Sequence, residues 1–174
     1  MKLDFPVMLA MLLLAAAIQT LMPSLHGGEL ALKAPLLPAV AIYYVLERPR
    51  PLGLFAALWA GILTDALGGV PPGTSSFGLL AAALFVSAVR KFLPEASWLV
   101  PTAAGAAISA FLVLLQYAVL WTRTGFNAPF YLLFRPLLVI VPVAAVVTTA
   151  VVAAARRIDL MAGNTEPRKE VAEP

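Results

Sequence analysis

The stretch GILTDALGGVPPGTSSFGLL, residues 61–80, places one carboxylate, Asp65, inside an otherwise uncharged apolar run. Gly61, Gly69 and Gly73 recur around it at four-residue steps. A charged side chain is costly in hydrocarbon and tolerated in water, so the surrounding medium decides what Asp65 can do. The composition of the whole chain identifies that medium.

The composition is that of a membrane protein. The chain has 174 residues, of which 61% are hydrophobic and 12% charged, and its mean hydropathy is +0.92. Soluble domains average about 45–50% apolar and about 25% charged residues. The chain has no cysteine, which excludes disulfides, thiolate metal sites and a cysteine nucleophile. The single His26 cannot form a histidine metal site alone, so neither a metal nor a cofactor is expected.

Six apolar windows predict six transmembrane helices, over residues 5–22, 30–46, 52–70, 76–92, 97–121 and 130–155. A helix needs about 20 residues to cross the ~30 Å hydrocarbon core. No segment alternates with period two, so strands are not expected. The first window has features of a cleavable signal peptide, but Asp4 cancels the charge of Lys2, and we interpret it as a retained span. We therefore expect an all-α, polytopic domain over residues 1–155 and a charged, mobile cytoplasmic tail over residues 156–174.

The basic residues orient these helices. If the N-terminus is cytoplasmic, nine lysines and arginines fall on the inner side, and Lys33, Arg123 and Arg135 fall on the outer side. Cytoplasmic loops carry an excess of basic residues in membrane proteins. The asymmetry predicts that both termini are cytoplasmic.

Three interpretations of Asp65 are open. It can lie near the outer headgroups in contact with water, it can anchor the turn GGVPPG, or it can pair with a partner or substrate through its charge. As a turn anchor it would accept hydrogen bonds from serine hydroxyls and from the N–H groups of Gly69, Val70, Gly73, Thr74 and Ser75. Gly61 shares a helical face with Asp65, where a small residue lets another helix approach closely. Gly69 and Gly73 favour the turn itself.

The segment GLFAALWAGILTDALGGVPPGTSSFGLLAAALF, residues 53–85, resembles the signature region of the bacterial rod shape-determining protein MreD family. That family is similar in having Gly-x3-Asp-x3-Gly-x3-Gly before another apolar span, and these positions are Gly61, Asp65, Gly69 and Gly73 here. The resemblance implies six helices in the bacterial cytoplasmic membrane, with a fold like the substrate-binding subunits of energy-coupling-factor vitamin transporters. It also implies a non-catalytic scaffold of the cell-elongation complex, acting in cell-shape control and peptidoglycan synthesis. The implied direct partner is MreC, with RodA, a class B penicillin-binding transpeptidase and MreB in the wider complex.

Two rival functions can be weighed on the residues. An enzyme is not expected, because Asp65 is the one acid in the spans and Glu29, Glu47 and Glu95 stand isolated in predicted loops. The alternative is a small-molecule, vitamin-type binding subunit of a membrane transporter, which needs a cavity with convergent polar groups. The polar residues available on the predicted outer side are Gln19, Gln116, Tyr117, Trp121, Arg123 and Asn127.

Overall fold

Runs of leucine, alanine and valine, interrupted by proline and glycine, form helices throughout the described part of the chain. The computed structural model describes residues 4–22, 25–26, 31–32, 34–68, 71–92, 98–125 and 129–161. Within these ranges the α-helices are α1 (Asp4–Leu21), α2 (Leu36–Glu47), α3 (Arg50–Gly68), α4 (Thr74–Val89), α5 (Leu99–Arg123) and α6 (Tyr131–Met161). A 3-10 helix, η1 (Arg90–Phe92), follows α4. The all-α class predicted from the sequence is therefore confirmed.

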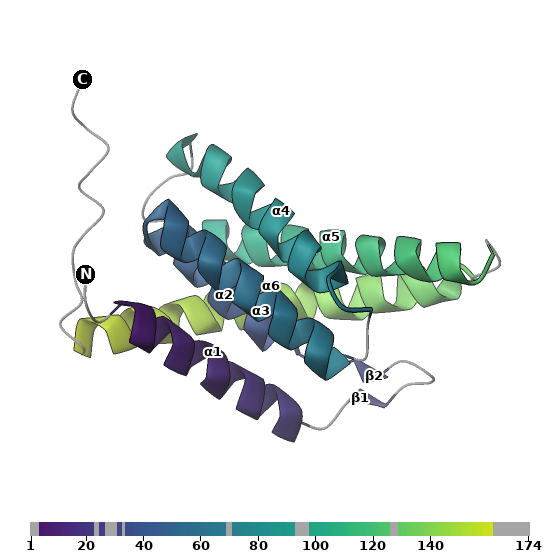
Figure 1. Ribbon diagram of the computed structural model, residues 1–174, viewed down its shortest axis with the longest axis horizontal. Coiled ribbons are helices and arrows are strands. Elements are labelled where there is room, and N and C mark those ends of the chain that lie inside the picture. The colour runs from purple at the N-terminus through teal and green to yellow at the C-terminus, as the bar shows by residue number, and fades with distance from the viewer. Residues whose placement is uncertain are drawn as a thin grey trace.

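The helices alternate in direction along the bundle (Figure 1). The α2–α3 turn, the end of α4 and the end of α6 consequently lie together at one end, which we call the Arg90 end. The end of α3, the start of α4, the end of α5 and the start of α6 lie at the other, which we call the Asp65 end. This arrangement places residues far apart in the sequence side by side.

Helix length separates the six helices into two groups. Three helices, α3, α5 and α6, are long and apolar enough to cross a membrane. The other three are apolar but shorter, and α2 has 12 residues, which extend about 18 Å. Length and hydropathy therefore support three membrane-crossing helices among the described residues, and the predicted count of six stays a prediction.

The predicted second span, residues 30–46, is wrong in its first part. Ala31–Leu32 forms strand β2, which pairs antiparallel with β1 (Leu25–His26), and α2 begins only at Leu36. Proline disfavours helical backbone in the residue before it and has no N–H to donate, so Pro35 sets the start of the helix. The expectation of no strands is likewise wrong, although each strand has only 2 residues.

Helix α2 forms the centre of the bundle. Every residue from Leu37 to Leu46 is buried, and α2 packs against each of the other five α-helices. A helix that is apolar on all sides is stable only when it is surrounded by other apolar surface. The core of the protein is therefore built around α2, and the neighbouring helices shield it.

Side chains from neighbouring helices satisfy both ends of α2. At its start, the Gln19 Oε1 atom on α1 accepts a hydrogen bond from the Leu37 N–H at 3.3 Å. At its end, the Arg90 guanidinium donates to the carbonyl oxygens of Val45, at 3.1 Å, and Arg48, at 2.6 Å. Helix termini have backbone groups without intrahelical partners, and a cation suits the C-terminal end of a helix. Gln19 and Arg90 therefore fix the central helix along its axis.

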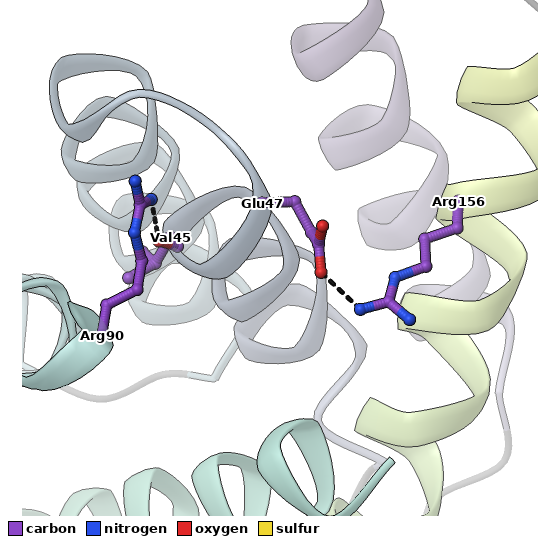
Figure 2. Close-up of polar contacts among 4 residues, drawn as sticks. All are labelled: Val45, Glu47, Arg90 and Arg156. Carbon is purple, nitrogen blue, oxygen red and sulfur yellow. Dashed lines mark hydrogen bonds and ion pairs between the residues drawn. The ribbon is translucent and has the colours of Figure 1, made fainter. Parts of the chain in front are cut away.

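Glu47 also differs from its predicted state. It was expected to be an isolated loop residue, but it is the last residue of α2 and forms an ion pair with Arg156 on α6 (Figure 2). Arg156 was expected to begin a mobile tail, whereas α6 continues to Met161. The rest of the predicted tail, residues 162–174, lies outside the described residues.

Candidate functional site

The candidate site lies where α3 meets the start of α4. Asp65 occupies the last turns of α3, and its side chain is only 6% exposed. Helix α4 begins at Thr74, directly after the sequence Pro71–Pro72–Gly73. The burial of Asp65 contradicts the interpretation of a carboxylate in contact with water near the headgroups.

Asp65 accepts four hydrogen bonds from the beginning of α4. Its Oδ1 atom accepts from the Ser75 N–H at 2.8 Å. Its Oδ2 atom accepts from the Gly73 N–H at 2.8 Å, from the Ser76 N–H at 3.3 Å and from the Ser76 hydroxyl at 3.0 Å. Gly73 and Ser75 are among the donors named from the sequence.

This carboxylate takes the place of an ordinary helix cap. The N-cap residue of α4 is Gly73, which has no side chain with which to cap the helix. A capping side chain normally accepts from the N–H groups of the second and third helical residues, which are Ser75 and Ser76 here. The start of a helix also favours negative charge. Asp65 therefore caps α4 from the preceding helix and joins the two helices.

Gly73 supplies the backbone conformation that the turn needs. Its φ angle is +97°, in the left-handed region, and nothing lies within 4 Å of the position that a Cβ atom would occupy. Substitution at this position is therefore limited by backbone conformation and not by space.

Gly61 lets the two helices approach closely enough for these bonds to form. A Cβ atom at this position would lie 2.3 Å from the Ser76 Cα atom and 2.8 Å from the Ser76 nitrogen. Both are backbone atoms, so the contact cannot be relieved by rotating a side chain. Gly61 lies one turn before Asp65 on α3, and the same stretch of α4 therefore contacts both residues.

A third helix reaches the same site. The Gln116 Nε2 atom on α5 donates to the Ser75 hydroxyl at 3.5 Å, a long hydrogen bond. Ser75 is fully buried, so this bond lies inside the bundle. We call the set Gly61, Asp65, Gly73, Ser75, Ser76 and Gln116 the Asp65 joint.

Of the four signature residues, the structure brings Gly61, Asp65 and Gly73 together in the joint, and Gly69 lies outside the described residues. The joint offers little chemistry, because both oxygens of its one carboxylate already accept hydrogen bonds. In the described part of the chain, no group of three or more His, Asp or Glu side chains could hold a metal ion. The arrangement positions backbone and does not present a reactive group.

A comparison with protein families identifies the chain. The model of the family described as rod shape-determining protein MreD matches residues 1–154. The chain belongs to the MreD family. The match covers the whole Asp65 joint and nearly all of the helical region. Membership of this membrane family gives the chain a role in rod shape determination. No significant match is found among curated proteins or among solved structures.

Two amides that the sequence offers as polar groups for a ligand instead join helices of the bundle. Gln116 was expected to form an interhelical hydrogen bond, and it donates to Ser75, whereas the bond from the start of α2 to Gln19 was not predicted. The capping of α2 by Arg90 was not predicted either. The sequence signal for such contacts is a lone amide side chain in an apolar helix, since this group needs a hydrogen-bond partner on another helix. Asn127, also in that set, lies outside the described residues.

Proposed function

We propose that this MreD-family protein is a non-catalytic membrane scaffold of the cell-elongation complex and that it binds MreC directly. RodA, a class B penicillin-binding transpeptidase and MreB belong to the wider complex, so the protein acts in cell-shape control through peptidoglycan synthesis. The family match over residues 1–154 is the observation that carries this proposal. No cofactor is required for such a role.

The internal contacts agree with a scaffold. A scaffold must hold its helices in fixed relative positions so that partners meet a constant surface. The Asp65 joint fixes α4 against α3, and Gln19 and Arg90 fix α2 at its two ends. The buried carboxylate is used entirely in these internal bonds. These contacts support a positioning role for Gly61, Asp65 and Gly73 in preference to a ligand-binding role.

We further propose that all six helices cross the bacterial cytoplasmic membrane and that both termini are cytoplasmic. Among the described residues, Arg48 and Arg50 are at the α2–α3 turn, Arg90 follows α4, and Arg156 and Arg157 are near the end of α6, which are elements of the Arg90 end. Arg123 ends α5 and Arg135 is near the start of α6, toward the Asp65 end. An excess of arginine favours the cytoplasmic side. Helix α2 is short, but it is enclosed by other helices and therefore does not need to match the thickness of the lipid.

The test is co-purification of the tagged protein from native membranes in a mild detergent, followed by identification of the bound proteins. The proposal expects MreC in amounts comparable to the tagged chain. A matched control carries Asp65→Leu, which should weaken recovery of MreC because the α3–α4 joint is disrupted. Recovery of an energy-coupling ATPase module in place of MreC would instead establish the vitamin-type transporter subunit.

A further inference from the structure

Helix α6 carries an exposed arginine, Arg135, near its start. Its segment Tyr131–Ile158 is apolar and long enough to cross a membrane, and it is the least buried of the three long helices. Arg135 lies one turn inside this segment, and its side chain is exposed. Within the part of the chain that the structure describes, Arg135 has no hydrogen-bond or ion-pair partner. A lone charge on a membrane helix is costly, and it needs a partner.

The packing of α5 against α6 sets the depth of this cation. The hydroxyls of Thr102 and Thr149 lie 2.7 Å apart across the two antiparallel helices. Gln116 lies fourteen residues after Thr102 on α5, and Arg135 lies fourteen residues before Thr149 on α6. Because the two helices are antiparallel, Arg135 is level with Gln116. Gln116 belongs to the Asp65 joint, where it donates to Ser75. Arg135 is therefore at the depth of that joint, about 6 Å from the start of α6.

The direction of the side chain favours the membrane surface. Side chains on an α-helix tilt toward its N-terminus, and the N-terminus of α6 is at the Asp65 end. A long arginine stem can lie along apolar surface while its guanidinium reaches the polar interface. Arg135 can thus extend toward the headgroups at this end of the bundle.

The surroundings of Arg135 are apolar and aromatic. Tyr131, Phe134 and Leu138 near the start of α6 and Phe130 just before it are all exposed, Leu138 to 73%. Aromatic side chains are enriched where a membrane helix passes the headgroups. Arg123, at the end of α5, is a second exposed cation without a partner among the described residues. The carboxylate of Asp65 cannot neutralise either arginine, because it is buried and bonded to α4.

We propose that Arg135 binds the phosphodiester group of a phospholipid, with an acyl chain lying along Phe134 and Leu138 and with Arg123 adding positive charge at the rim. A guanidinium matches the geometry of phosphate oxygens and donates two parallel hydrogen bonds. The apolar flank must be covered by hydrocarbon in a membrane, and one phospholipid molecule supplies both groups. The site prefers lipids with net negative charge, because a choline ammonium group would be repelled by the two arginines. This inference does not depend on binding to MreC.

Tryptophan fluorescence provides a local test in the full chain reconstituted into vesicles. The protein has three tryptophans, Trp59, Trp98 and Trp121. With Trp59 and Trp98 replaced by phenylalanine, Trp121 near the end of α5 reports on lipids at the Asp65 end, since the same register places it level with Phe130. The matched variant that keeps only Trp98 reports on the other end of the same helix. The probes are brominated phosphatidylglycerol and brominated phosphatidylcholine, which quench tryptophan on contact.

The site predicts that Trp121 is quenched with about a fivefold preference for brominated phosphatidylglycerol, the effect of one basic residue near anionic lipid. Arg135→Gln should lower that preference to the smaller part that Arg123 supplies, Arg135→Lys should retain most of it, and neither should alter quenching of Trp98. If Arg135→Gln does not fold, high salt added to the wild-type reporter should remove the preference at Trp121. An unchanged preference in Arg135→Gln, or in high salt, would overturn the proposal. The proposal would also be overturned if Arg135→Gln released a co-purifying protein without changing the lipid preference, because Arg135 would then bind an acidic protein segment.

Discussion

Replacing Asp65 tests the joint between α3 and α4 directly. Asparagine keeps the shape of the side chain but has one acceptor oxygen, whereas both oxygens of Asp65 accept bonds in the structure. If the asparagine oxygen takes the Oδ2 position, it keeps Gly73 and Ser76 and leaves the fully buried Ser75 N–H facing an NH₂ group. Stranding a buried donor costs about 1–3 kcal/mol. We therefore expect Asp65→Asn to lower the free energy of unfolding by about 1–3 kcal/mol.

Leucine at position 65 removes both acceptors. The N–H groups of Ser75 and Ser76 are buried and would both lose their partner, while the Gly73 N–H is exposed and can turn to water. The expected loss for Asp65→Leu is about 2–6 kcal/mol. The matched control is Thr64→Val on the same helix. Among the described residues, the Thr64 hydroxyl bonds only to the Ala60 carbonyl within α3, so this change should stay within about 0.5 kcal/mol.

The assay is unfolding of the purified protein in mixed micelles with increasing sodium dodecyl sulfate, monitored by near-ultraviolet circular dichroism. We predict that the wild type and Thr64→Val are the most stable, that Asp65→Asn is less stable and that Asp65→Leu is the least stable. The capping role of Asp65 is refuted if the free energy of unfolding of Asp65→Leu is within about 0.5 kcal/mol of the wild-type value. If Asp65→Asn is folded and abundant in cells but without function, the charge of Asp65 is used in binding, and the positioning role is wrong.

The remaining predictions concern packing, the central helix, topology and catalysis. Gly61→Ala should destabilise the protein by about 1–3 kcal/mol or more in the same assay, because its Cβ atom would meet the Ser76 backbone; an unchanged stability would contradict the close approach. Arg90→Met should lower the free energy of unfolding by about 1.5–3 kcal/mol, because its bonds to the carbonyls at the end of α2 are lost. Glu47→Gln, which breaks an exposed ion pair, should lower it by about 0–1 kcal/mol. A larger loss for Glu47→Gln than for Arg90→Met would refute the capping role. In this cysteine-free chain, a single cysteine that replaces Thr124 should react with an impermeant maleimide applied to intact cells. A single cysteine that replaces Trp98 should not react. The opposite pattern would mean that the topology is inverted. His26→Ala should leave cell shape and growth unchanged, since no catalytic role is assigned to this residue.

The sequence predicted the features that depend on local chemistry. Apart from the first part of the second window, long apolar runs predicted helices close to where they lie in the structure. The turn between Glu47 and Arg50 follows from Pro49 and Pro51, which cannot donate backbone hydrogen bonds. The donors around Asp65 could be named because the carboxylate and the turn are adjacent in sequence. Such features need only short-range information.

The features that were missed depend on which helices pack together. Hydropathy cannot distinguish a helix that faces lipid from one enclosed by other helices, so the 12 residues of α2 were read as part of a longer span. Glu47 and Arg156 are 109 positions apart, and no local pattern indicates that they meet. The same limit applies to Asp65, because the use of both carboxylate oxygens appears only when α4 is placed against α3.

Depletion in a rod-shaped bacterium that carries this protein as its own MreD tests the central claim most directly. Cell width and length are measured by microscopy as the protein is withdrawn and then restored from a plasmid. We predict that depleted cells become round and that the wild-type chain returns them to rods. Cells that keep their rod shape and growth rate without the protein would contradict a role in rod shape determination.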